Sequence, residues 1–480
     1  MSGSLRVELL SPSEIDSIYE KCLTILSTYG VKVDYEKGLK FLDQAGAQVD
    51  YKTQMVKFPV DMIEAALKTV PHEITVKGGL DKHDYVVPHP EGSFYTTTCV
   101  QTMLYHNPDN NEFEDVTQDS FAKWCQLTDH LPQIDICAIQ TPMDVPRETA
   151  DIHALNIQLQ NTSKPLMLLS YCFESVPYLF DLMLARQGGE AGLKERGLLL
   201  VNPTSLSPLV YKDMDMEELF LATKYGIPVA ANSLVVTGGT GPVTTAGTVL
   251  LTSTEILAML VMSQLMNPGN PFVSTVFNTS LDMMTGSALL GDINTNLTRA
   301  ATAQFIKAKF KTPVETFSYM SDAYSPDGQA SVEKSLMPTL DALGGSDILY
   351  GAGRLGGTTC ASPVQLVIDN YLTEISRQFV AGVKFDEDRL ALDQILEAGA
   401  GGNYLTMEHT RDYCRDGIRP ELFAQIGLDT WKATGRKNLY DRAVDKYKEI
   451  QKELKPQDLP DDIVKEMNSI VKKADKAMCS

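Results

Sequence analysis

Eight short apolar runs decide the fold of this chain: FYTTT (94–98), IDICAIQ (134–140), PLMLLS (165–170), LLLVNP (198–203), PVAANS (228–233), FVSTVF (272–277), VETFSY (314–319) and ILYGA (348–352). Each run is followed by a longer stretch with helical spacing, and successive runs start 30 to 44 residues apart. That distance is the length of one strand with one helix. Nearly continuous apolar runs are typical of parallel strands covered on both faces, and eight such units close into a barrel. The sequence therefore predicts an α/β fold, a (β/α)₈ TIM barrel over residues 91–363.

Helical extensions are predicted on both sides of the barrel. In residues 1–90, Ser11 or Ser13 can cap a helix that ends near Gly30, and further helices are expected around 36–45 and from Pro59 onward. In residues 364–480, helices are expected over 364–382, 387–399, 420–434 and 439–454. The chain shows no Pro/Gly/Ser linker, so we expect both extensions to pack on the barrel.

Composition excludes several classes of partner. The chain has 480 residues, a net charge of −20 and a pI of about 4.8, which disfavours nucleic acid and anionic membrane surfaces. Small cations and zwitterions remain open as ligands, and so does a homo-oligomer. The eight cysteines form no CxxC pair and the N-terminus lacks a signal-peptide pattern, so we expect reduced thiols and a cytoplasmic location. The apolar stretch 249–266 contains Glu255 and Gln264 and is interpreted as a buried barrel helix.

The ends of the predicted strands hold candidate site residues, because active sites of such barrels lie where the strands end. These positions are rich in amides, hydroxyls and aromatic rings, and none of them is a histidine. Such a lining suits binding and orienting a substrate better than moving protons. The polar positions are Gln140, Ser170, Asn202, Ser205, Asn232, Asn278, Asp322 and Arg354.

A carboxylate and several rings share this region. Glu315, Phe317 and Tyr319 alternate along one run, so we expect all three on one face of the strand. If that face points inward, Glu315 is a buried carboxylate that needs partners. Rings lie at or beside the strand ends and could together attract a quaternary ammonium group. They are Tyr95, Tyr105, Tyr171, Phe277, Phe317, Tyr319, Tyr324 and Tyr350.

Two glycine-rich segments differ in their interpretation. TGGTGPVTTAGT (237–248) lacks the GK[ST] ending of a phosphate loop and is interpreted as a tight turn before a helix. GAGRLGGTT (351–359) follows the eighth run, where backbone N–H groups of such barrels often hold anionic groups. Gly351, Gly353 and Gly356 are therefore candidate cofactor-binding residues, and Arg354 could clamp a carboxylate. The seven histidines form no HxH or HExxH pair, so no bound metal is predicted.

The chain resembles the trimethylamine methyltransferase family, in particular its members that lack pyrrolysine. The resemblance covers nearly the full length, and its order and spacing are more specific than any one segment. The matching segments are YGVKVDYEKGLKFLDQAGAQVD (29–50), IQLQNTSKP (157–165), NPTSLSPL (202–209), GIPVAANS (226–233), TGGTGPVTTAGT, SDAYSPDGQASVEK (321–334), GAGRLGG (351–357), GGNYLTMEHT (401–410) and DTWKATG (429–435).

This resemblance implies transfer of a methyl group to the cobalt of a corrinoid (cobalamin) carried by a partner protein. Relatives without pyrrolysine are associated with quaternary amines such as glycine betaine, proline betaine, carnitine and γ-butyrobetaine. The leaving group is then a neutral tertiary amine that needs no general acid, in agreement with the histidine-poor strand ends. We assign the cation to Tyr95, Phe317, Tyr319 and Tyr324, and the carboxylate to Arg354, His409 and Asn202. Glu315 and Asn202 are the candidate catalytic residues.

Three alternatives stay open at this point. A barrel that binds betaine without turning it over would give the same binding data. A methyltransferase for a tertiary methylamine would use the same fold. A lyase or aldolase would need a lysine or metal at the strand ends, and Lys164 lies at the start of a run instead.

Overall fold

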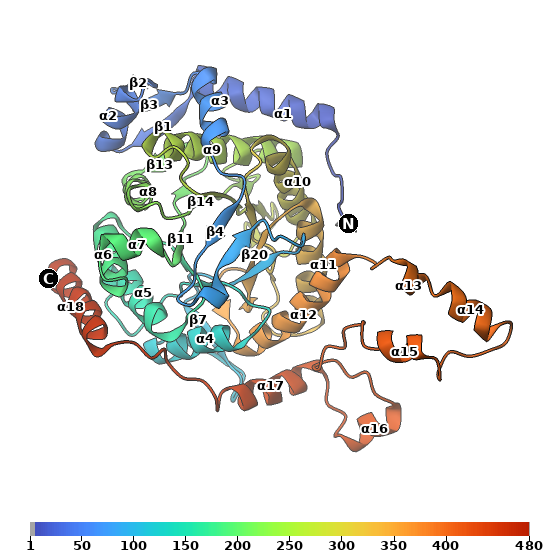
Figure 1. The fold of residues 1–480 in the computed structure, drawn as a ribbon. Coiled ribbons are helices and arrows are strands. Elements are labelled where there is room, and N and C mark those ends of the chain that lie inside the picture. Colours follow the sequence, from blue (N-terminus) through green and yellow to red (C-terminus); the bar gives the residue numbers. More distant parts are fainter. Residues whose placement is uncertain (1–4, 480) are drawn as a thin grey trace.

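A computed structural model describes residues 5–479. Its centre is a closed barrel of eight parallel strands with helices around it (Figure 1). Around the barrel the strands follow the order β6-β20-β19-β16-β14-β11-β10-β9. A bridge between Thr97 and Ile136 joins the two ends of this order and closes the barrel.

All eight predicted strands are confirmed. The strands are β6 (Tyr95–Thr98), β9 (Cys137–Ala138), β10 (Leu166–Leu168), β11 (Leu199–Val201), β14 (Val229–Ser233), β16 (Phe272–Val276), β19 (Val314–Thr316) and β20 (Ile348–Ala352). Every residue in them is buried. The apolar character of the runs therefore reflects burial on both faces of a parallel sheet.

A helix follows each barrel strand. The outer layer consists of α4 (Gln118–His130), α5 (Ala150–Asn161), α6 (Val176–Arg186), α7 (Glu190–Glu195), α8 (Asp213–Tyr225), α9 (Thr245–Met266), α10 (Ile293–Lys309), α11 (Gly328–Gly344) and α12 (Pro363–Ala381). Among the described residues, α9 alone is long and apolar enough to cross a membrane, and 78% of its most apolar window is buried in the protein. It packs against the barrel on one side and the N-terminal region on the other, so the interpretation as a buried barrel helix is confirmed.

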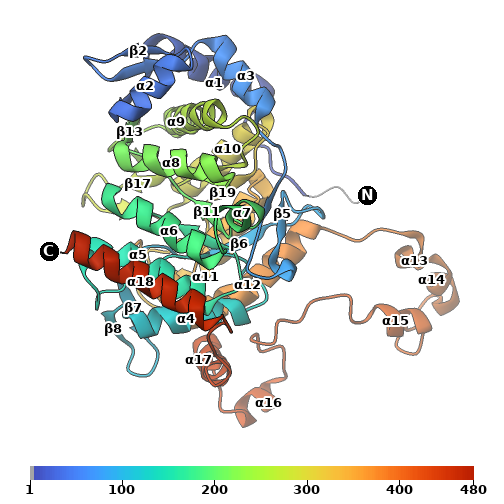
Figure 2. The ribbon, with the colours of Figure 1, turned by 60° about the vertical axis from the view of Figure 1, so that its left-hand side comes forward.

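The N-terminal region lies over α9 (Figure 2). It contains the expected helices α1 (Pro12–Thr24), α2 (Glu36–Gln44) and α3 (Val60–Thr69). It also contains a sheet that the sequence analysis missed. In that sheet β1 (Val31–Asp34), β2 (Gln48–Asp50) and β3 (Met55–Lys57) join β13 (Val210–Lys212), so the extension is tied to the barrel by strand pairing.

Opposite ends of the barrel are covered differently. The hairpin of β4 (Ile74–Val76) and β5 (Tyr85–Val87) lies at the end where the strands begin, and the Val86 carbonyl accepts a hydrogen bond from the Tyr95 hydroxyl. Two small sheets surround the mouth, where the strands end. One contains β7 (Leu104–Asn107), β8 (Glu112–Asp115), β21 (Arg354–Leu355) and β22 (Cys360–Ala361), and the other contains β15 (Val236–Thr237), β17 (Thr279–Leu281) and β18 (Ala288–Leu289).

The C-terminal region divides into packed and projecting parts. α12 contacts β20, α17 (Leu439–Ile450) packs on α12, and α18 (Asp461–Met478) packs on α5 and α6. Between them α13 (Glu387–Leu390), α14 (Leu392–Ala398), α15 (Glu408–Tyr413) and α16 (Leu428–Ala433) project from the barrel and bury no residue (Figure 1). The expected packing on the barrel is thus absent from this segment. Its helices are also shorter than expected.

Candidate active site at the barrel mouth

Three aromatic rings from neighbouring strands stack near the mouth. Phe277 follows β16, Phe317 follows β19 and Tyr350 lies in β20. The ring of Phe317 stacks on Phe277 with 3.7 Å between centroids, and the ring of Tyr350 lies 3.9 Å from Phe317, tilted by 40°. Rings so close cannot share one face, so both faces of Phe317 are covered. The partly exposed member of the stack is Phe277.

Glu315 lies one inward position below these rings. Its Oε2 atom accepts a hydrogen bond from the Thr275 hydroxyl at 3.0 Å, whereas its buried Oε1 atom has no partner among the described residues. Burial raises the pKa of Glu315 to about 8. It is the one charged side chain in the eight barrel strands as described above. A carboxylate in this position favours a ligand that brings a positive charge.

Arg354 lies above the rings and is buried with 2% exposure. Its guanidinium donates to the Val100 carbonyl and to the Tyr350 hydroxyl, the latter at 3.3 Å. The buried Nε atom has no partner in residues 5–479, and no carboxylate there lies within ion-pair distance of Arg354. A buried guanidinium without a counter-ion favours an anionic ligand group.

Neutral polar groups complete the inward surface at this level. Asn202, directly after β11, donates to the Ala230 carbonyl at 2.8 Å, and its own carbonyl oxygen lacks a partner among the described residues. The side-chain oxygen of Asn232 is unpaired in the same sense, whereas Asn278 accepts a hydrogen bond from Thr252 of α9 and so faces the helix layer. Such groups are normally satisfied when buried, so they indicate a place for a polar ligand or water.

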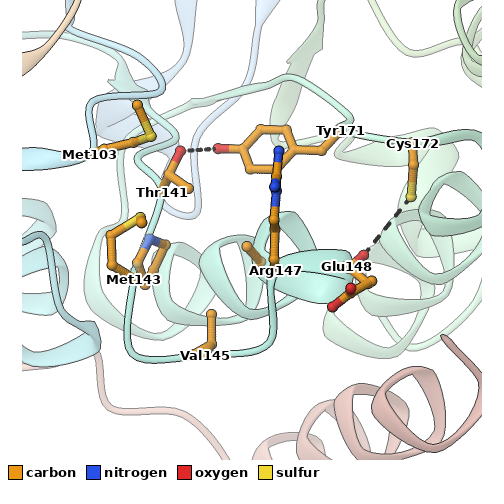
Figure 3. A pocket seen from close by; sticks show the side chains of 10 residues that line it. Met103, Thr141, Met143, Val145, Arg147, Glu148, Tyr171 and Cys172 are labelled. Carbon is orange, nitrogen blue, oxygen red and sulfur yellow. Dashed lines mark hydrogen bonds between the residues drawn. The ribbon is translucent and has the colours of Figure 1, made fainter. Parts of the chain in front are cut away.

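A cavity of about 720 Å³ opens on the mouth between the loops that follow β9 and β10 (Figure 3). Met103, Met143, Val145 and Tyr171 contribute apolar lining, and the Tyr171 hydroxyl lies 2.7 Å from the Thr141 hydroxyl. No group of three or more His, Cys, Asp or Glu side chains that could hold a metal ion is found within residues 5–479. Glu315, Arg354 and Phe277 are not among the residues that line this cavity.

The four residues assigned to the cation do not gather in one place. Tyr95 begins β6, so it lies at the closed end of the barrel against Tyr85 and His89. The hydroxyl of Tyr319 bonds to Thr373 of α12 at 2.7 Å, because β19 ends at Thr316 and the expected alternation stops there. The expectation that Tyr95 and Tyr319 line the mouth is wrong.

Tyr324 and Phe317 lie nearer the mouth, but they do not form a set of rings around a common binding position for the cation. Tyr324 is 68% exposed and stands edge-on to Phe113. Phe317 is enclosed between its two neighbours, as described above. The ring that can meet a ligand in the stack is Phe277, which the sequence placed among the strand-end aromatics without preferring it.

His409 and the glycines also differ from expectation. The Nε2 atom of His409 bonds to the Asp388 carbonyl within the projecting segment, away from the barrel. The N–H of Gly353 donates to Asp369 at 2.6 Å and that of Gly356 to the Ala323 carbonyl at 2.7 Å, so neither is free to hold a cofactor. Gly351 is needed for packing, because a Cβ there would lie 3.1 Å from the Tyr319 carbonyl oxygen.

Barrel, mouth and comparisons with known proteins together define the class: the chain is a methyltransferase built on an eight-stranded α/β barrel. The family model described as trimethylamine methyltransferase matches residues 2–479. The chain therefore belongs to the trimethylamine methyltransferase family.

Curated relatives span this chain almost entirely. The trimethylamine methyltransferase of Methanosarcina acetivorans is 30% identical over 99% of this chain and 97% of its own length. The trimethylamine methyltransferase of Desulfitobacterium hafniense is 27% identical over 97% of this chain and 93% of its own. A glycine betaine methyltransferase, also from Desulfitobacterium hafniense, is 26% identical over 89% and 88%.

Among solved structures, the monomethylamine methyltransferase of Methanosarcina barkeri is similar to this chain. Its TM-score is 0.52 at 12% identity, with 92% of each chain covered. At that identity the likeness concerns the fold, and it agrees with the barrel and its extensions.

Proposed function

We propose that the chain demethylates a small quaternary amine that also carries a carboxylate, such as glycine betaine, and passes the methyl group to a corrinoid protein. One observation carries this proposal. Inside the barrel, Arg354 and Glu315 both lie close enough to Tyr350 to act on its pKa, Arg354 lowering it and Glu315 raising it, yet neither has an ion-pair partner among the described residues. A zwitterion supplies the missing charge to each.

The residues divide the work as follows. The partly exposed ring of Phe277 offers a face to the cation, and Glu315 supplies negative charge from below. Arg354 holds the carboxylate, with Asn202 and Asn232 as nearby hydrogen-bonding groups. The reduced cobalt of the corrinoid partner supplies the nucleophile, and the C–N bond breaks with its electron pair remaining on the amine nitrogen. Because the amine leaves neutral, no residue has to donate a proton.

The mouth also suits the docking of another protein. Large apolar side chains on the loops after the strands are 46% to 95% exposed, and methionine is frequent among them. They are Met103, Met143, Leu206, Val243, Met283, Met284 and Tyr324. Exposed apolar groups at one end of a molecule mark interaction surfaces, and methionine adapts its shape to a partner. We assign this rim to the docking of the corrinoid protein. We also propose that the enzyme is cytoplasmic.

The test is turnover. Purified chain is incubated with cob(I)alamin and a panel of glycine betaine, proline betaine, carnitine, γ-butyrobetaine, choline and trimethylamine, and methylated cobalamin is followed in the visible spectrum. We expect activity with carboxylate-bearing quaternary amines. Activity with trimethylamine alone would favour the second candidate, a tertiary methylamine methyltransferase, which the names of the relatives suggest.

A further inference from the structure

Residues 383–436, here called the arm, leave the barrel after α12 and return to it at α17. Figures 1 and 2 both show the arm pointing away from the barrel. No residue between 383 and 419 is buried. Residues 383–419 of the arm are therefore not covered by their own chain, whereas Pro420 and Leu422 are buried where the arm meets the barrel again.

The arm nevertheless has a defined internal structure. The guanidinium of Arg389 pairs with Asp386 and, at 2.9 Å, with Asp416, and it lies 4.9 Å from the centre of the Tyr413 ring. These contacts join the outgoing and returning halves of the arm. These contacts hold the arm in one conformation, so it can bind a surface with little loss of conformational entropy.

Apolar side chains are displayed along the arm. Val383 is 81% exposed, Phe385 74%, Leu392 63%, Leu396 70% and Leu405 87%. Leu392 and Leu396 are four residues apart in α14 and so share one face. Solvation of this much apolar surface is unfavourable, at roughly 25 cal/mol per Å². Such a surface indicates a permanent partner.

A second apolar patch lies on the outer face of α11 and α12, beside the base of the arm. Val332 and Leu336 are four residues apart on α11, and Ile375 and Phe379 are four residues apart on α12. The two helices pack side by side. Every chain thus carries an apolar arm and an uncovered apolar patch next to its root.

The position of the arm excludes the barrel mouth as its neighbour. Arg377, near the end of α12, donates to the Phe94 carbonyl and to Asp135, which precede β6 and β9. The root of the arm therefore lies at the end where the strands begin. A corrinoid protein docked on the rim of the mouth would sit at the opposite end.

We propose that two copies of this chain exchange arms, so that the arm of each lies on the α11–α12 patch of the other about a two-fold axis. Both required surfaces are present once on each chain, as an isologous interface needs. A stable interface buries about 800 Å² per partner, and each aromatic side chain contributes roughly 150–250 Å². Phe379 and Phe385 from both copies, together with the leucines of both arms, can reach that area. The proposal is independent of the substrate.

The first test measures the mass of the full chain in solution by light scattering over a dilution series. The wild type is expected to be dimeric, or a multiple of dimers. The arm variant Leu396→Asp/Leu405→Asp and the patch variant Val332→Asp/Leu336→Asp are each expected to weaken the dimer on the order of 100-fold. The matched control Tyr29→Asp, at a 65% exposed ring of the N-terminal region, should leave the dimer unchanged.

Mixing the two variants distinguishes exchange from other arrangements. A dimer of one arm variant with one patch variant retains one intact contact, between the wild-type arm of the second and the wild-type patch of the first. We expect the mixture to dimerise more strongly than either variant alone. A monomeric wild type, a patch variant that dimerises normally, or a mixture no stronger than its components would each overturn the proposal.

Discussion

Glu315 destabilises the folded protein when no ligand is bound, because its buried carboxyl group must either stay protonated or ionise without a counter-ion. Its pKa is raised to about 8 in the folded state from 4.5. The folded state therefore binds a proton that the unfolded state has lost, and this contribution to stability falls as pH rises from about 4.5 to about 8.

The variant Glu315→Gln removes that dependence. We expect its free energy of unfolding, relative to wild type, to rise by roughly 5 kcal/mol between pH 4.5 and pH 9, measured by urea denaturation. Glu218→Gln is the comparison variant. Burial also raises the pKa of Glu218 to about 8, but its carboxylate accepts a hydrogen bond from Ser170 and has no role in the proposed binding of the ligand. Both variants should shift stability. An unchanged pH profile in Glu315→Gln would show that its carboxyl is solvated.

Ligand binding separates these two carboxylates. Since a cation favours the ionised form of Glu315, we expect the affinity for glycine betaine to rise between pH 6 and pH 9 in wild type and in Glu218→Gln. In Glu315→Gln the affinity should be independent of pH. Isothermal titration calorimetry measures both, and a pH dependence that persists in Glu315→Gln would place the cation elsewhere.

Arg354 should distinguish ligands by their carboxylate. We expect Arg354→Met to weaken glycine betaine by about 10- to 100-fold, while choline, which has the cation without the carboxylate, changes little. Arg354→Lys keeps the charge but loses the fork geometry, so it should lie between the two. Equal losses for both ligands in Arg354→Met would indicate a structural role.

At the scale of elements, the turn between β20 and β21 is constrained by packing. Gly353 has a φ of +82°, and a Cβ there would lie 2.3 Å from the Trp124 ring. We expect Gly353→Ala to lower the free energy of unfolding by about 3 kcal/mol, from backbone strain and overpacking together. Gly269→Ala is the control, with a φ of +87° and nothing within 4 Å of the added atom. It should cost about 1 kcal/mol. Equal losses would mean that Trp124 moves aside freely.

At the scale of the whole molecule, the C-terminal helix closes the outer layer. α18 buries Met467 and Val471 against α5 and α6, and Asp475 pairs with His153 at 3.0 Å. We expect Val471→Asp to lower the thermal midpoint clearly, because it buries an unpaired charge. Lys472→Asp, one residue further on an exposed face, should have little effect. If both variants melt together with wild type, α18 is not part of the cooperative unit.

Much of the architecture could be predicted because it depends on short-range patterns. Most of the eight runs are largely apolar, and each lies in a strand whose residues are all buried. The sheet of β1, β2, β3 and β13 could not be found in this way. Its strands are three or four residues long, and β13 lies more than 150 residues beyond β3 in the chain.

The site could be predicted less well than the fold. Glu315, Asn202 and Arg354 could be chosen as candidates because their runs locate the mouth, and the structure leaves each of them with a buried polar atom that has no partner among the described residues. Tyr319 was misplaced because β19 ends at Thr316, three residues before the end of its run, so the alternation does not continue to Tyr319. Tyr95 was misplaced because the first residue of a strand lies at the end opposite to the last.

The sequence by itself determined the barrel, its eight strands and the family, because burial and spacing along the chain encode them directly. Only the tertiary structure decided which charges inside the barrel lack partners, which ring of the stack has a free face, and that the arm leaves its own barrel. These properties depend on contacts between residues far apart in the chain, and no local pattern specifies them.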